Sequence, residues 1–227
     1  MRRFDTVFFD LDGTLTDPGP GITNSVRYAL ERFGISVGDR RELYRFIGPP
    51  LMDSFRTFYG FSHDAAAEAV RLYRVYFREA GMFENSVYPG ISALLDAMRA
   101  DGRRLVVATS KPEEFAVTIM DHFGLSQYFD CIAGAAMDET RTQKWEVIDY
   151  AVDRCGLADR GGILMVGDRE HDILGARRCA LGGAVGVLYG YGDRAELTAA
   201  GADAVAETVA ELGALILNRN YFFEQEL

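Results

Sequence analysis

The chain has 227 residues, of which 48% are hydrophobic and 26% charged, proportions that are ordinary for a globular protein. The formal net charge of −10 argues against a broad basic surface, and therefore against binding to nucleic acid or to an anionic membrane. No run approaches the ~18 apolar residues of a membrane span, and the start of the chain lacks the apolar segment of a signal peptide. The three cysteines have no C-x-x-C spacing, so we expect reduced thiols and a cytoplasmic protein.

The first part of the chain predicts one strand followed by helices. Residues 4–10 are expected to form a buried strand, because an apolar run there ends abruptly in carboxylates. A turn-rich stretch follows, and residues 16–84 then contain four helical patterns and no convincing strand. We therefore expect residues 16–84 to form an all-helical cap domain, inserted after the first strand.

From residue 85 onward, predicted helices and strands alternate. Further strands are expected at 104–109, 130–134, 162–167 and 184–188, with helices at about 90–100, 113–122, 144–154 and 172–180 and two more helical segments at the end. Strands separated by helices of 10–15 residues indicate an α/β fold with a doubly wound, parallel (Rossmann-like) sheet and right-handed crossovers. Its catalytic core is predicted to comprise residues 1–15 and 85–227.

Polar side chains follow three of the predicted strands. They are Asp10, Asp12, Gly13 and Thr14 after the first strand, Thr109 and Ser110 after the second, and Asp168 and Asp172 after the fourth. In a parallel sheet these ends lie at one edge, which is where ligands bind in open α/β sheets. The period of an extended chain sends Asp10 and Asp12 to the same side, where two carboxylates need a cation or a shared proton.

The first pair of acids suits phosphoryl transfer. A carboxylate can attack phosphorus to give an aspartyl-phosphate, and Asp10 is the candidate nucleophile. Asp12 can protonate the leaving oxygen and later deprotonate the water that hydrolyses the intermediate.

The remaining groups suit a metal ion and a phosphate. Mg²⁺ prefers oxygen ligands, which Asp10 and Asp168 can supply, with Asp172 as a direct, water-mediated or more remote ligand. The Thr109 hydroxyl can hold a phosphate oxygen, and Lys144 can supply positive charge. Only Lys111 and Lys144 are lysines among the 24 basic residues. Lys111 is either a loop charge near the site or a second compact ammonium required there.

These motifs resemble the haloacid dehalogenase-like (HAD) hydrolase superfamily. The resemblance is carried by D-x-D-G-T at 10–14, the strand-end Thr109, the downstream Lys144 and G-D-x-x-x-D at 167–172, in matching order across nearly the whole chain. It implies Asp10 as nucleophile, Asp12 as acid/base with its backbone carbonyl on Mg²⁺, and Asp168 on the metal. It also implies Thr109 and Lys144 on the phosphate, and we expect Gly13, Thr14 and Ser110 to take part in substrate binding beside them. The helical insert is similar to the caps of phosphoglycolate phosphatases and β-phosphoglucomutases.

We expect a Mg²⁺-dependent phosphatase that hydrolyses a small phosphomonoester, with phosphoglycolate as the leading substrate type. A 5′-nucleotidase, a pyrophosphatase or a phosphosugar mutase is an alternative, and a non-enzymatic protein on the same fold is a third class. Phosphonate hydrolysis is disfavoured because residues 16–84 contain no lysine for a Schiff base. Dehalogenation is disfavoured because Asp12 would have no leaving oxygen to protonate. The expected partner is a small phosphorylated metabolite, and the expected state is a monomer or homodimer.

Overall fold

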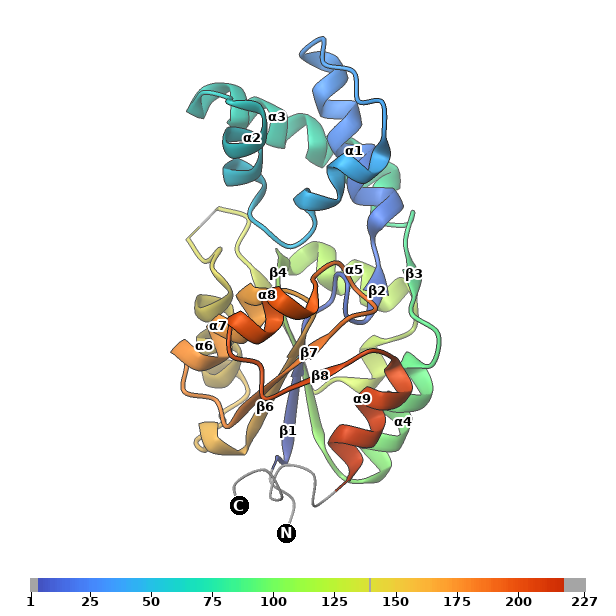
Figure 1. The fold of residues 1–227 in the computed structure, drawn as a ribbon, viewed down its shortest axis with the longest axis vertical. Coiled ribbons are helices and arrows are strands. Elements are labelled where there is room, and N and C mark those ends of the chain that lie inside the picture. The colour runs from blue at the N-terminus through green and yellow to red at the C-terminus, as the bar shows by residue number, and fades with distance from the viewer. Residues whose placement is uncertain (1–3, 139, 219–227) are drawn as a thin grey trace.

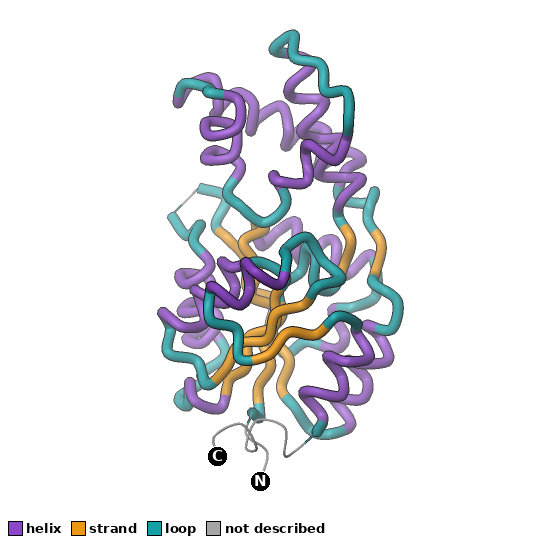
Figure 2. The backbone as a smooth tube through the Cα atoms, in the orientation of Figure 1, coloured by secondary structure: helices purple, strands orange, loops and turns teal. Residues whose placement is uncertain are grey.

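A six-stranded parallel sheet organises the protein (Figures 1 and 2). The computed structural model describes residues 4–138 and 140–218. The strand order is β5-β4-β1-β6-β7-β8. The strands are β1 (Thr6–Phe9), β4 (Arg104–Pro112), β5 (Cys131–Ala135), β6 (Ile163–Gly167), β7 (Gly183–Val187) and β8 (Ala204–Ala206). All pairs within this sheet are parallel, which confirms the predicted fold class.

Strand β1 lies inside the sheet between β4 and β6, and β4 continues five residues past the level at which β1 ends. Phe9, its last residue, pairs with Val107 of β4 and with Val166 of β6. The polar residues that follow β1 and β6 therefore lie beside Thr109 and Ser110, although these segments are far apart in the sequence. Strand β4 was expected to end at residue 109 but runs to Pro112, so Thr109 and Ser110 lie within it. This register is what brings the predicted site together.

Helices cover both faces of the sheet (Figure 1). Alternate side chains of β1 explain why, because Val7 and Phe9 belong to one buried cluster and Phe8 to another. Helices α6 (Lys144–Arg154), α7 (Glu170–Arg178) and α8 (Arg194–Ala199) pack on the Phe8 side. Helices α4 (Ile91–Ala100), α5 (Glu113–His122) and α9 (Val209–Leu217) pack on the opposite side. Short 3₁₀ turns occur at η3 (Ser126–Tyr128) and η4 (Arg160–Gly162).

The predicted cap segment forms a group of helices beyond the carboxyl ends of the strands (Figure 1). Its elements are α1 (Gly19–Arg32), the 3₁₀ helix η1 (Arg40–Phe46), α2 (Leu51–Tyr59), α3 (His63–Tyr76) and the π-helical turn η2 (Phe77–Gly81). Aromatic rings fill its interior; Phe46, for example, lies 5.0 Å from Phe55, centroid to centroid. The split into a core and a cap at residues 15/16 and 84/85 stays a prediction.

Three expectations about the elements need correction. Residues 16–84 do contain a strand, because β2 (Thr16–Asp17) pairs antiparallel with β3 (Ser86–Val87). A sixth sheet strand, β8, lies between the two last helices. Strands of two or three residues are too short to show an alternating pattern, so the sequence gives no sign of them. Helix α7 begins at Glu170, not near residue 172, which places Asp172 in its first turn. Within the described part of the chain, no helix combines the length and apolarity needed to cross a bilayer.

Candidate active site

The centre of the site is the segment directly after β1. Asp10 is buried, with 6% of its surface exposed, and its Oδ1 accepts a hydrogen bond from the backbone N–H of Leu11 at 2.8 Å. Gly13 follows with φ of +82°, a left-handed conformation that favours glycine. A Cβ at Gly13 would also lie 2.2 Å from Oδ2 of Asp168, so glycine is required for this close approach. The D-x-D-G-T segment is therefore folded tightly against the end of β6.

The structure brings three carboxylates together. One oxygen each from Asp10, Asp168 and Asp172 lies within 4.8 Å of the others, and all three residues are buried. Asp168 follows β6, and its carboxylate accepts hydrogen bonds from the backbone N–H of Tyr191 (2.8 Å) and from Oγ1 of Thr14 (3.4 Å). The predicted convergence of strand ends thus produces a compact acidic cluster.

Lys144, the first residue of α6, points into this cluster. Its Nζ lies 2.9 Å from Asp10 Oδ1 and 2.7 Å from Asp172 Oδ1, and it donates to the Ala108 carbonyl at 3.1 Å. Burial alone would lower the pKa of Lys144, but the two carboxylates outweigh burial and the pKa lies above its ordinary value. Lys144 is therefore a fixed positive charge beside Asp10.

The acidic cluster fits a divalent cation. Burial, together with the carboxylates of Asp172 and Asp10, raises the pKa of Asp168 well above its usual range. Burial also raises the pKa of Asp172, although Lys144 opposes this shift. Raised pKa values mean that packing these charges together costs free energy, which a cation between them would offset. An all-oxygen donor set of carboxylates is what Mg²⁺ prefers.

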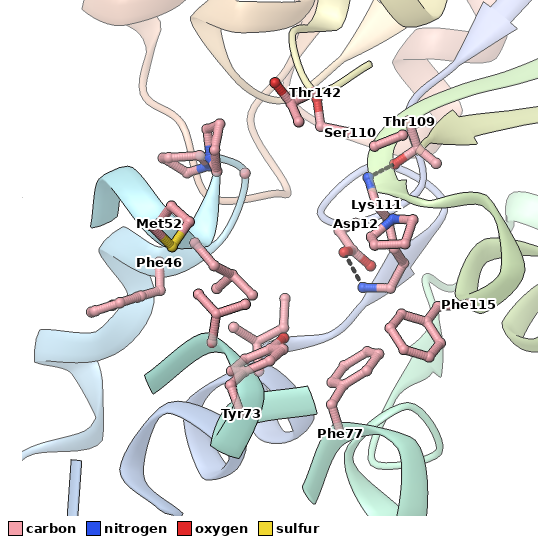
Figure 3. Close-up of a pocket in the computed structure, with 18 of the residues that line it drawn as sticks. Asp12, Phe46, Met52, Tyr73, Phe77, Thr109, Ser110, Lys111, Phe115 and Thr142 are labelled. Carbon is pink, nitrogen blue, oxygen red and sulfur yellow. Dashed lines mark hydrogen bonds and ion pairs between the residues drawn. The ribbon is translucent and has the colours of Figure 1, made fainter. Parts of the chain in front are cut away.

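Asp12 has a separate partner, Lys111 (Figure 3). The Lys111 ammonium contacts Oδ2 of Asp12 and also lies 4.6 Å from the ring centre of Phe77 in the cap. Oδ1 of Asp12 is buried and has no hydrogen-bond partner among the described residues. Burial raises the pKa of Asp12, with Lys111 acting in the opposite direction. The two oxygens of Asp12 therefore have different surroundings.

A cavity of about 280 Å³ is lined by Asp10 and Asp12. It lies between the end of the sheet and the cap helices (Figure 3). The core contributes polar groups to its wall, including Thr109, Ser110 and Lys111. The cap contributes Phe46, Met52, Tyr73 and Phe77 and the loop of Gly48, Pro49 and Pro50. Phe115 of α5 adds a further ring. The core side of the site is mainly polar, and the cap side is mainly apolar, with Asp53 and Arg74 as its charged side chains.

Of the predicted residues, Asp10, Asp12, Thr109 and Ser110 line the cavity. Gly13 and Thr14 contact Asp168, and Lys144 contacts Asp10, but these three residues do not line the cavity. The Thr109 hydroxyl accepts a hydrogen bond from the Lys111 N–H at 3.2 Å.

Three features of the site were missed from the sequence. The Lys111–Asp12 contact was signalled only by the rarity of lysine. The aromatic rings of the cavity wall have the helical spacing that is also typical of the interior of a helical domain, so the sequence does not mark them as cavity residues. A contact from Arg169 to the cap, described below, gave no signal at all.

With this geometry in view, comparison with known proteins places the chain in a family. Residues 7–182 match the haloacid dehalogenase-like hydrolase family. The chain belongs to this family, and it is a phosphatase-type hydrolase.

Several named proteins and one solved structure are similar to most of this chain. A protein of Pseudomonas aeruginosa named 5′-nucleotidase is 49% identical over 197 residues, covering 87% of this chain and 88% of the relative. The crystal structure of a predicted phosphatase from Clostridium acetobutylicum has 46% identity and a TM-score of 0.91, covering 94% of this chain and 98% of that one. The tyrosine-protein kinase PtkA of Mycobacterium tuberculosis is 41% identical over 82% of this chain, which spans 62% of PtkA. Proteins named phosphoglycolate phosphatase match at 26–29% identity.

Proposed function

We propose that the protein is a Mg²⁺-dependent phosphomonoesterase that works through an aspartyl-phosphate on Asp10. The observation that carries this proposal is the buried convergence of Asp10, Asp168 and Asp172 near the ammonium of Lys144, with Asp10 also lining the cavity. Asp10 and Asp168 are the proposed direct metal ligands, with the Asp12 backbone carbonyl as a third. Asp172 already has partners on both oxygens, Lys144 and the Arg169 N–H, so its proposed role is to fix Lys144 and to add negative charge near the ion.

The first step is attack of an Asp10 carboxylate oxygen on phosphorus. A P–O bond to Asp10 forms while the P–O bond to the leaving group breaks. Bound Mg²⁺ would neutralise charge on the phosphoryl oxygens. Lys144 and the Thr109 hydroxyl, with Ser110 beside them, are proposed to hold those oxygens in line for attack. Oδ1 of Asp12 is the proposed proton donor to the leaving oxygen, because Oδ2 is occupied by Lys111.

The second step returns the enzyme to its starting state. Oδ1 of Asp12, now deprotonated, accepts a proton from water as the water attacks the phosphorus of the intermediate. The bond from phosphorus to Asp10 breaks, and inorganic phosphate leaves. The cap residue Phe77 packs on Lys111 beside this proton relay, which limits the access of bulk water.

We propose nucleoside monophosphates as the substrate class. The rings of Phe46, Tyr73, Phe77 and Phe115 line the cavity, and the flat aromatic face of a nucleobase can stack on rings of this kind. The relative named 5′-nucleotidase supports the same choice. A cavity of about 280 Å³ is also larger than a two-carbon acid such as glycolate requires.

Phosphoglycolate is the second candidate, because of Lys111. Its ammonium lines the cavity within reach of Asp12 and can pair with a substrate carboxylate. The more distant relatives named phosphoglycolate phosphatase are consistent with this candidate.

A substrate panel separates these candidates. Phosphate release would be measured with nucleoside monophosphates, phosphoglycolate, pyrophosphate, phosphotyrosine and glucose 1-phosphate, each with Mg²⁺ and with EDTA. We expect the highest kcat/KM for a nucleoside monophosphate and a loss of about 10³-fold in EDTA. A preference for phosphoglycolate would replace the first candidate by the second. Turnover of glucose 1-phosphate only in the presence of a bisphosphate activator would indicate a mutase and refute hydrolysis as the main reaction.

A further inference from the structure

Arg169 connects the end of β6 to the cap. It follows Asp168 directly, and its Nη1 donates a 2.7 Å hydrogen bond to the backbone carbonyl of Ile47. Ile47 follows η1, and the Gly48, Pro49 and Pro50 loop that lines the cavity begins at the next residue. The side chain of Arg169 is 18% exposed, so this bond is largely shielded from water. A single arginine therefore spans from the proposed metal ligand to the wall of the substrate cavity.

The loop of Gly48, Pro49 and Pro50 has few backbone donors of its own and packs against Arg169. Pro49 and Pro50 have no N–H group, so these residues cannot donate backbone hydrogen bonds of their own. Gly48 has φ of +104°, and a Cβ there would lie 3.2 Å from Cγ of Arg169. Any larger residue at this position would be strained in conformation and crowded against the arginine. Gly48 thus packs against the Arg169 side chain, and the carbonyl of the preceding residue, Ile47, accepts a hydrogen bond from the guanidinium.

The guanidinium is itself fixed in place by the core. Glu196, in the first turn of α8, accepts from Nε of Arg169 at 2.8 Å through Oε1. The same oxygen accepts from the backbone N–H of Glu170 at 2.8 Å. Two donors from consecutive residues therefore meet one carboxylate, which orients the arginine fork toward the cap. A lysine could reach Glu196 or Ile47 but has no rigid fork for both.

We propose that Arg169 is a positioning residue that holds the Ile47–Pro50 loop over Asp10 and Asp12 and thereby sets the affinity for substrates whose leaving group fills the cavity. The inference rests on the proposed phosphatase function. It predicts that Arg169 acts on leaving-group binding and not on the metal. Arg169 would then be a determinant of specificity located in the core, outside the cavity wall.

Steady-state kinetics with two probes test this proposal. The ring of p-nitrophenyl phosphate reaches the loop, whereas acetyl phosphate is too small to do so. For Arg169→Ala we expect KM for p-nitrophenyl phosphate to rise about tenfold or more, because a charge-assisted hydrogen bond is lost. KM for acetyl phosphate and the Mg²⁺ activation constant should change less than about threefold. Arg169→Lys should fall between wild type and Arg169→Ala.

The matched control is Arg177→Ala. Arg177 lies on the same helix, α7, but its guanidinium bonds Gly201 and Asp203, away from the cavity. This variant should resemble wild type with both probes. Glu196→Ala removes the carboxylate that orients the Arg169 guanidinium but leaves the guanidinium in place. It should give a smaller rise in KM for p-nitrophenyl phosphate, of about threefold. It also keeps the proposal testable should Arg169→Ala fail to fold.

Hydrogen–deuterium exchange gives a readout that does not need turnover. Peptides covering residues 43–55 should exchange faster in Arg169→Ala than in wild type or Arg177→Ala, without Mg²⁺ or substrate. Unchanged exchange, an equal loss with both probes, or a shift only in the Mg²⁺ activation constant would overturn the proposal. An inactive wild type would instead refute the proposed function, and the exchange experiment would still test the loop contact.

Discussion

The two walls of the cavity are built in different ways. On the core side, Asp10 and Asp12 follow β1, and Thr109 and Ser110 lie in the last part of β4, two neighbouring strands in fixed register. Asp10 follows Phe9, which pairs with Val107 and Val166, so a shift of one residue would turn the whole strand over. On the cap side, mainly apolar side chains come from helices and a loop, together with the charged residues Asp53 and Arg74. The core thus places the reacting groups, whereas the cap supplies the surface that contacts the variable part of the substrate.

This contrast suggests a division of labour between the two walls. Changes on the core side should reduce turnover with every substrate, because they remove interactions with the phosphoryl group. Changes on the cap side should alter the ranking of substrates while leaving the chemistry in place. The predictions below test that division, beginning with the largest effect.

Replacement of Asp10 should have the largest effect. The Asp10→Asn variant removes the nucleophile, and we expect turnover to fall by about 10⁴-fold or more with every substrate. Thermal unfolding should show a folded protein. Asp96→Asn, on the exposed side of α4, is the matched control and should retain activity. Activity close to wild type in Asp10→Asn would remove Asp10 from the mechanism.

Removal of the metal should have the second-largest effect on turnover. Chelation with EDTA should lower turnover by about 10³-fold, and Mg²⁺ should restore it. Saturating Mg²⁺ should raise Tm by roughly 5–10 °C, because an ion that binds only the folded state adds about 2.7 kcal/mol at one hundred times its Kd.

The matched variant for this experiment is Asp168→Asn. It should lose most of the Mg²⁺-induced rise in Tm and should unfold at a higher temperature than wild type in EDTA, because one of three clustered charges is gone. A full Mg²⁺ response in Asp168→Asn would show that the ion binds elsewhere.

Replacement of Asp12 should depend on the leaving group. For Asp12→Asn we expect a loss of about 10²-fold with an alkyl phosphate, whose leaving oxygen needs a proton. The loss should be smaller with p-nitrophenyl phosphate, whose leaving group departs unprotonated. Paired kcat/KM values for the two esters measure the difference. Equal losses would contradict the role of Asp12 as the acid.

A change in the cap wall should have the smallest effect and the most selective one. Met52 lines the cavity from α2, and Met52→Trp would fill part of the space. We expect kcat/KM for a nucleoside monophosphate to fall about tenfold, with a change of less than about threefold for pyrophosphate. If both substrates lost activity alike, the cap wall would not select the leaving group.

The same contrast explains what could be read from the sequence. Apolar runs that end in carboxylates show both a strand and its functional end, which is why the sheet and the cluster of Asp10 and Asp168 could be predicted. Contacts such as Lys111 to Asp12, or Arg169 to Ile47, join residues about a hundred positions apart and leave no local pattern. Periodicity also shows that Phe46 and Phe77 are apolar faces of helices, but not whether they meet other helices or a cavity.

The short ribbon of β2 and β3 has a mechanical consequence. Both connections between the helical segment and the sheet pass through it, and Thr16 and Asp17 are paired there with Val87 and Ser86. Swivelling about either connection alone would break these pairs, whereas bending the ribbon as a unit would keep them. A rotation of the helical segment that keeps these pairs would therefore be confined to bending of the ribbon, and it would return the same cavity wall to the same reacting groups.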